Sequence, residues 1–243
     1  IPLLAAIATD AVAVGCRDRA AADLVASLDG VDADGVDATR VTVTGDDALG
    51  LTPSTVVPPT TAPYVAVTVR HAAYVGTHDS DALTLWVRAV DDLAVDRGWD
   101  VVGVALNGRG PEPEVATLAR LRSTVAVRAR WHTIVAGPDP RDLVALLAPA
   151  GAVAAQSYHA ALLGLAAGVP SVIAAGSGYY RSKAGGLAGL ADLPDALAVT
   201  DPGALAASLA TVGEAMTSRP SPLADATAAV DAWWTALPSL VRR

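Results

Sequence analysis

Hydrophobic and polar positions along this chain follow two patterns, and segments with one pattern alternate with segments with the other. The run YVAVTVR at 64–70 is apolar at nearly every position, which is typical of a strand buried on both faces. Residues 82–97 instead carry apolar side chains at three- and four-residue spacing, and Gly98 follows them. These two patterns predict a buried strand followed by a helix that presents one apolar face to it.

The alternation continues as far as residue 216. Further strands are predicted at 100–107, 132–137, 151–156, 170–176 and 197–200. Helices are predicted between and after them at 114–126, 140–148, 158–167, 184–191 and 201–216. Strands that alternate with helices are joined by right-handed crossovers. We therefore expect an α/β fold with a parallel, Rossmann-like sheet and helices on both faces.

A proline-rich segment separates this region from the start of the chain. Four prolines stand within the thirteen residues LTPSTVVPPTTAP, a density that excludes helix and removes sheet donors. We expect 53–63 to be an extended linker and 64–216 a C-terminal Rossmann-like domain. Before the linker, two strand patterns flank a helix, so 1–52 are predicted to be the end of an N-terminal Rossmann-like domain whose earlier part lies outside this sequence. The amphipathic segment 217–243 is predicted to form a helix that packs back on the body.

The net negative charge of the chain argues against several kinds of partner. The formal net charge is −8 and no basic stripe is visible, which argues against nucleic acid and against an anionic membrane surface. No uncharged apolar stretch reaches the length of about eighteen residues that predicts a transmembrane helix. Cys16 is the single cysteine, which excludes an intramolecular disulfide and is compatible with a reducing compartment. We expect a cytoplasmic protein.

Ligands of a parallel sheet bind outside the carboxyl ends of its strands, and two predicted strands end in residues able to carry chemistry. The turn after Gln156 places Ser157 at the N-cap and His159 in the first turn of a helix, where free backbone N–H groups attract anions. The strand at 64–70 ends at Arg70 and is followed by His71, and both are candidates to line a cleft. For His159, a histidine held by a backbone carbonyl is the structural alternative.

The segment SGYYRSK at 177–183 is expected to be a loop at the same edge of the sheet. It holds Arg181 and Lys183, the only lysine of the chain, and both side chains suit a carboxylate or a phosphate. A solvated loop is the structural alternative. The glycine patterns of dinucleotide enzymes, P-loop proteins and α/β-hydrolases do not occur, which disfavours these three classes.

Three segments in order resemble the polysaccharide pyruvyl transferase family. The first, AVAVGCRDRAAADLVASL, resembles a Val-x-x-Arg-Asp-x-x-Ser motif at Arg17 and Asp18, and VTVTGDDAL resembles a following Asp-Pro-Ala motif at Asp46 and Ala48. The third, AVAAQSYHAALLGLAAGVPSVIAAGSGYYRSKAGGLAGLADL, resembles the C-terminal signature of the family. Its matching positions are His159, Ala160, Gly168-Val169-Pro170, Tyr180 and Lys183. The resemblance spans roughly residues 11–191 and implies a GT-B-like fold, in which two Rossmann-like domains face a cleft.

The resemblance also implies an activity. It implies an enzyme that moves pyruvate from phosphoenolpyruvate to two hydroxyls of a sugar in a cell-surface polysaccharide or glycolipid, forming a cyclic ketal without a metal or organic cofactor. The partners are then phosphoenolpyruvate and a glycan acceptor. His159 is the implied acid–base residue, because imidazole exchanges protons near neutral pH. The expected substrate-binding residues are Arg17, Arg70, Ser157, Tyr158, Tyr180, Arg181 and Lys183.

Two positions depart from the pattern of the family. Its motif arginine, two residues before the histidine, is Ser157 here, and the leucine after it is Tyr158. That arginine is expected to help hold the acidic donor, so Arg70, Arg181 or Lys183 must compensate for its loss. Two alternatives stay open: a GT-B glycosyltransferase or epimerase that binds a nucleotide-sugar at the same helix start, and a non-catalytic glycan-binding relative, which Ser157 favours.

Overall fold

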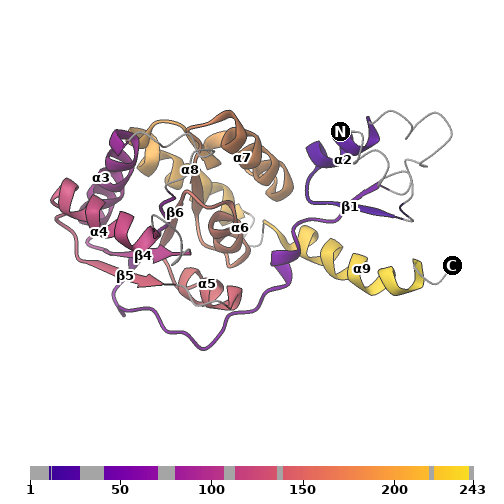
Figure 1. Cartoon of the computed structure of the whole chain (residues 1–243), viewed down its shortest axis with the longest axis horizontal. Helices are drawn as coiled ribbons and strands as arrows, with labels where there is room; N and C mark the ends of the chain where they lie inside the picture. Colours follow the sequence, from indigo (N-terminus) through magenta and orange to yellow (C-terminus); the bar gives the residue numbers. More distant parts are fainter. Residues whose placement is uncertain are drawn as a thin grey trace. The chain divides into compact units, whose positions relative to one another are not determined.

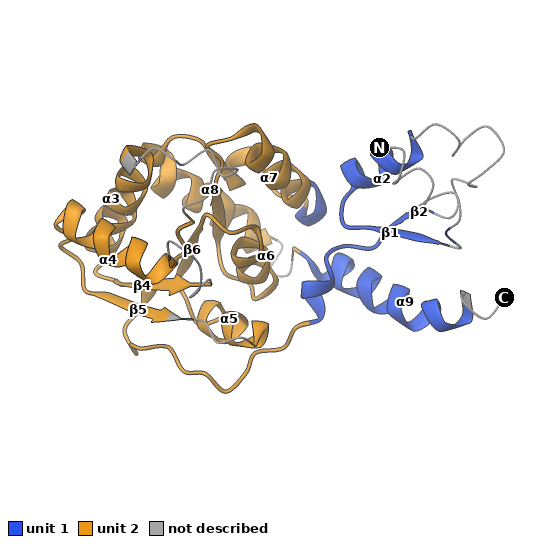
Figure 2. Ribbon diagram, viewed as in Figure 1, with its two compact units in different colours: residues 1–50, 189–191, 223–243 blue, residues 51–188, 192–222 orange. Residues whose placement is uncertain are grey.

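The structure, a computed structural model, describes residues 11, 13–27, 41–70, 80–106, 113–135, 139–218 and 222–240. The chain divides into two compact units (Figure 2). Unit 1 comprises residues 1–50, 189–191 and 223–243, and unit 2 comprises residues 51–188 and 192–222. Each unit contains a parallel sheet of its own.

Unit 2 is built on a parallel sheet, as the alternating pattern predicts. Among the described residues its six strands are β3 (Tyr64–Val67), β4 (Asp100–Ala105), β5 (Trp131–Val135), β6 (Ala152–Ala155), β7 (Ser171–Ala174) and β8 (Ala198–Val199). All neighbouring pairs run parallel, in the order β5-β4-β3-β6-β7-β8. β3, β4, β6 and β7 are buried at every position, which explains their unbroken apolar runs.

Helices follow the strands in unit 2 (Figure 1). They are α3 (Ser80–Arg97), α4 (Glu114–Val125), α5 (Pro140–Leu147), α6 (Tyr158–Ala166), α7 (Gly178–Ala191) and α8 (Leu205–Ser218), with short 3-10 turns η4 (Asp195–Leu197) and η5 (Pro202–Ala204). α3 packs against α4 and α8, whereas α5 packs against α6. The strand order proceeds in one direction from β3 to β5 and in the other from β6 to β8. Right-handed crossovers then place helices on opposite faces, and the direction reverses between β3 and β6.

The segment expected to be a loop at 177–183 is instead the start of a helix. α7 begins at Gly178, and the Ser177 side chain caps it by accepting a hydrogen bond from the backbone N–H of Tyr180. The sequence predicted only the second half of this helix, because Gly176 and Gly178 at its start are typical of a loop. The correction places Arg181 and Lys183 on a rigid element rather than on a loop.

The motif Gly168-Val169-Pro170 is a helix stop. Gly168 has φ of +79°, a left-handed conformation that suits glycine, and its N–H bonds the carbonyl of Leu165. The N–H of Val169 bonds the carbonyl of Gly164 over 2.9 Å, which completes a Schellman ending of α6. Pro170 cannot continue the helix. This part of the resemblance therefore reports chain geometry and carries no chemistry.

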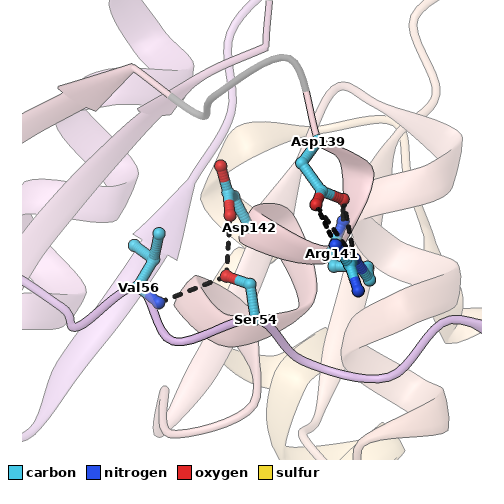
Figure 3. A network of polar contacts seen from close by, with 5 residues as sticks. All are labelled: Ser54, Val56, Asp139, Arg141 and Asp142. Carbon is cyan, nitrogen blue, oxygen red and sulfur yellow. Dashed lines mark hydrogen bonds and ion pairs between the residues drawn. The ribbon is translucent and has the colours of Figure 1, made fainter.

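The segment 51–63 is extended and is held on unit 2 by side chains (Figure 3). Ser54 Oγ donates to a carboxylate oxygen of Asp142 over 2.7 Å and accepts from the N–H of Val56. Beside this contact, Asp139 caps α5, and hydrogen bonds from the Arg141 side chain and backbone lower the pKa of Asp139. Because of the Ser54–Asp142 hydrogen bond, the proline-rich segment is part of the folded surface of unit 2.

Within its described residues, unit 1 has two short parallel strands, β1 (Val14–Cys16) and β2 (Val41–Val43). Between them in the chain, α2 (Arg19–Ala26) is capped by Asp18, whose side chain accepts from the N–H of Ala21. The 3-10 turn η2 (Asp47–Gly50) and the long helix α9 (Ala224–Leu240) complete the described part of the unit. No helix within the described ranges is both long and apolar enough to cross a bilayer.

Candidate functional site

Two strand ends meet where the direction of strand order in unit 2 reverses. β3 and β6 are neighbours in the sheet, so the segment after Val67 lies beside the turn after Ala155. The hydroxyl oxygen of Thr68 accepts hydrogen bonds from the N–H of Gln156 over 3.1 Å and from the N–H of Ser157 over 3.2 Å. In open α/β sheets ligands bind at such a reversal. The topology therefore places the candidate site here.

A buried polar network extends from this point to a third strand. Gln156 Oε1 accepts from the backbone N–H of Arg70 over 2.7 Å. The guanidinium of Arg70 lies 3.7 Å from a carboxylate oxygen of Glu114, and the other carboxylate oxygen accepts from the N–H of Leu106, just beyond β4. Gln156 and Glu114 are 1% and 5% exposed, so contacts within the protein hold their side chains in place.

Sequence reasoning did not single out Thr68 or Glu114, and it placed Gln156 in the functional turn before His159 without giving it a role of its own. Thr68 stands within a β-branched run, where threonine reads as an ordinary strand residue. Glu114 stands at the first position of a helix, where acidic residues are common on surfaces. Its near-complete burial is a tertiary property. A polar residue at a strand end was the only available signal.

The turn after β6 starts a helix as predicted. Ser157 occupies the N-cap of α6 with extended backbone angles, and within the described part of the chain its side chain makes no capping hydrogen bond. Tyr158 is buried, whereas His159 is exposed, and the two rings meet edge-on with centroids 5.5 Å apart. An exposed imidazole at the carboxyl edge of a sheet is accessible to a substrate. Its role stays a prediction.

A cationic and aromatic cluster joins the starts of α6 and α7. Lys183 Nζ lies 5.6 Å from the centre of the Tyr158 ring and 4.6 Å from that of Tyr179. Both distances fall within the range of cation–π attraction, which stabilises an ammonium group without neutralising it. The structure thus brings together Lys183 and Tyr158, two predicted site residues that stand twenty-five positions apart in the printed sequence.

The remaining predicted residues take different positions. On α7, Tyr180 is 2% exposed, whereas Arg181 is exposed. His71 lies outside the described residues. Arg17 lies on unit 1, where its guanidinium donates two hydrogen bonds to Asp18, over 3.1 and 2.9 Å. Which of these side chains contact a substrate stays a prediction.

Cys16 is not a candidate nucleophile. It lies in the core cluster of unit 1 with Ala22 and Val25. Burial raises the pKa of its thiol, and the nearby charge of Asp18 raises it further. Because the thiolate is the reactive form, this environment makes the thiol inert at neutral pH.

Comparison with known proteins identifies one family. The family model described as polysaccharide pyruvyl transferase matches residues 1–177, well over half of the 243-residue chain. No curated protein sequence gives a match. The matched region contains β1 to β7 and ends at the N-cap of α7, so it includes His159 and excludes Lys183.

Solved structures of sugar-nucleotide enzymes share the fold. A putative UDP-N-acetylglucosamine 2-epimerase from Listeria monocytogenes has a TM-score of 0.62 and 16% identity over 93% of this chain. The Anabaena protein HepE in complex with UDP-glucose has a TM-score of 0.52 and 16% identity, covering 98% of this chain and 67% of that one. The chain spans 59% of the length of the Listeria protein. At these identities the likeness shows a GT-B-like fold and no more.

Proposed function

The chain belongs to the polysaccharide pyruvyl transferase family, and we propose that it transfers pyruvate from phosphoenolpyruvate to two hydroxyls of a sugar as a cyclic ketal. The acceptor sugar belongs to a cell-surface polysaccharide or a glycolipid. The observation that supports this assignment is the gathering of His159, Tyr158 and Lys183 at the carboxyl edge of unit 2. An acid–base group and an ammonium group there match the two requirements of the reaction.

The reaction sets those requirements through its bond changes. A proton added to the methylene carbon of phosphoenolpyruvate turns it into a methyl group and leaves a cation at the carbon that carries the phosphate. One sugar hydroxyl attacks that carbon, the carbon–oxygen bond to phosphate breaks, and the second hydroxyl attacks the same carbon. Two carbon–oxygen bonds form and one breaks. Of the two hydroxyl protons released, one balances the new methyl hydrogen and the other leaves with inorganic phosphate.

His159 is the proposed proton carrier. Its imidazole is exposed in the first turn of α6, beside the reversal of strand order where a ligand of this fold binds. The edge-on contact with the buried Tyr158 ring restrains the imidazole. A restrained imidazole donates a proton to the methylene carbon and accepts one from the attacking hydroxyl.

Lys183 is the proposed substitute for the missing motif arginine. Ser157, which stands in place of that arginine, has no charge to offer the carboxylate or phosphate of the donor. The ammonium of Lys183 lies against the ring of the next residue, Tyr158, so a cation is restored close to the same position. Arg181, which is exposed two residues before Lys183 in α7, is the proposed second cation. Arg70 is a weaker candidate, because its charge is shared with the buried carboxylate of Glu114.

The proposal requires no metal and no organic cofactor, since proton transfer and anion binding account for each bond change. A cytoplasmic location is part of the same proposal. It rests on the single cysteine of the sequence, which leaves no intramolecular disulfide to form.

One assay tests the proposed function. The full chain is incubated with phosphoenolpyruvate and a panel of glycans, and released phosphate is measured together with an acid-labile ketal on the glycan. We expect both products in equal amounts from the wild type. We expect neither from His159→Ala or from His159→Gln, which keeps a polar group of similar reach but cannot carry the proton. Unchanged thermal unfolding of both variants is the control for folding.

Other outcomes of this assay contradict the proposal. Equal turnover by wild type and His159→Gln would remove the acid–base role of the imidazole. Turnover or binding of a nucleotide-sugar, with no response to phosphoenolpyruvate, would assign the chain to the glycosyltransferase alternative. Binding of a glycan with no turnover of either donor would support a non-catalytic relative.

A further inference from the structure

Unit 1 holds a pocket that is formed entirely by its own residues. The pocket has a volume of about 390 Å³, within the size range of small-molecule sites. It lies at the carboxyl ends of β1 and β2, and α9 contributes the adjacent indoles of Trp233 and Trp234. No residue that lines this pocket belongs to the polar network of Thr68, Gln156 and Glu114 in unit 2.

The two indoles are held in place by different means. A Cβ added to Gly15 would lie 3.1 Å from the ring of Trp233, so the missing side chain at Gly15 lets this ring approach the backbone of β1 closely. Trp234 is 51% exposed, and its Nε1 donates to the Asp47 carboxylate over 3.0 Å. An indole that is exposed and held by a hydrogen bond presents an apolar face of fixed orientation on which a ligand can pack.

The charges of the pocket indicate the kind of ligand. Its lining includes one arginine, Arg17, and two carboxylates, Asp46 and Asp47. The guanidinium of Arg17 also pairs with Asp18 over 2.9 Å. Negative charge therefore exceeds positive charge, which disfavours a phosphate or a carboxylate ligand. Carboxylates accept hydrogen bonds from hydroxyl groups, and indole faces pack against aliphatic C–H groups. A neutral sugar ring offers both.

We propose that this pocket binds a neutral hexopyranose ring of the acceptor, with the sugar packed on Trp234 and its hydroxyls bonded to Asp46 and Asp47. The inference rests on the proposed function for the identity of the sugar as acceptor. The sugar-binding property of the pocket stands on the geometry alone. It assigns a role to α9, which lies outside the region matched by the family model.

Binding of simple sugars by the full chain tests the proposal. Methyl gluco-, galacto- and mannopyranosides are titrated in turn, without phosphoenolpyruvate, and followed by tryptophan fluorescence and by calorimetry. We expect at least one of them to bind the wild type, and Trp234→Ala to weaken that binding roughly tenfold or more. Trp234→Phe keeps an aromatic face and is expected to retain part of the affinity. Leu85→Ala is the matched control, since Leu85 is 50% exposed on α3 of unit 2.

The possible results distinguish a failure of the proposed sugar pocket from a failure of the proposed pyruvyl transfer. Trp234-dependent sugar binding without any phosphate release would uphold the pocket and overturn only the pyruvyl transfer. Pyruvyl transfer with the same acceptor KM in wild type and Trp234→Ala would overturn the pocket and leave the function intact. No binding of any of the three sugars, or fluorescence quenching by phosphoenolpyruvate that Trp234→Ala abolishes, would also overturn it.

Discussion

Gln156 Oε1 accepts the backbone N–H of Arg70 over 2.7 Å, although the two residues stand 86 positions apart. The bond ties the end of β3 to the turn that begins α6, the two segments between which strand order reverses. Each segment contributes a predicted substrate-binding residue. The relative position of Arg70 and His159 therefore depends on the side-chain amide of Gln156.

Removal of this acceptor is expected to destabilise unit 2. Gln156→Leu preserves bulk and leaves the N–H of Arg70 without its partner, which costs about 1–3 kcal/mol of unfolding free energy. Urea denaturation of the purified chain measures the loss. The control is Thr211→Ala on α8, an exposed threonine whose hydroxyl bonds only a carbonyl of its own helix, and it should change stability by less than about 0.5 kcal/mol. Equal midpoints for the two variants would show that the bond is dispensable.

The hydroxyl of Thr68 offers a second test of the same reversal point. Thr68→Val keeps the shape of this buried side chain and removes the oxygen that accepts the N–H groups of Gln156 and Ser157. We expect a loss of about 1–3 kcal/mol, because the buried N–H of Ser157 loses its acceptor, whereas the N–H of Gln156 keeps the backbone carbonyl of Thr68, 3.2 Å away. Thr68→Ser keeps the oxygen and should lose less. The idea fails if valine proves as stable as threonine and serine is the less stable variant.

The cation–π cluster predicts a donor-binding defect that depends on charge. Lys183→Gln removes the ammonium that the proposed function assigns to the anionic donor, and a charge-assisted bond of about 1.5–3 kcal/mol corresponds to a KM for phosphoenolpyruvate raised roughly tenfold to a hundredfold. Lys183→Arg keeps the charge and should retain more affinity. Arg88→Gln removes one positive charge from the exposed face of α3 and serves as the control. A KM that Lys183→Gln leaves at the wild-type value would exclude Lys183 from donor binding.

Asp100 predicts a specific dependence of stability on pH. Burial acts to raise the pKa of this carboxyl, but hydrogen bonds from Thr60 and His132 outweigh it and lower the pKa below the ordinary value of 3.8. The ionised group therefore contributes stability that is fully present above that value and is lost as pH falls through the lowered pKa. Unfolding measured between about pH 2 and pH 6 should show a steeper acid loss in the wild type than in Asp100→Asn.

Thr60→Val is the matched variant for this measurement. It removes one of the hydrogen bonds that lower the pKa of Asp100, so the acid loss should begin at a higher pH than in the wild type. Thr60 belongs to the proline-rich segment, and the same variant tests whether that segment is held on unit 2 by this contact. If wild type, Asp100→Asn and Thr60→Val lose stability over the same acid range, neither the lowered pKa of Asp100 nor the contribution of the Thr60 contact holds.

The parallel sheet of unit 2 could be predicted from the sequence because its strands are buried on both faces. Burial of that kind leaves unbroken apolar runs in β3, β4, β6 and β7, which are typical of strands of this length. The end of α6 could be predicted equally well, because Gly168 and Pro170 end a helix through their own backbone conformations. The start of α7 could not, since its glycines conceal a helix that Ser177 caps.

By itself, the sequence determined which strands exist, that they run parallel, and that His159 stands just after one of them. These properties follow from local burial and local backbone preference. Only the tertiary structure decided that β3 and β6 are neighbours, that Lys183 lies on the ring of Tyr158, and that Trp234 and Asp47 share a pocket. Such contacts join distant segments through packing and hydrogen bonds, and neither the composition of a segment nor its periodicity records its partner.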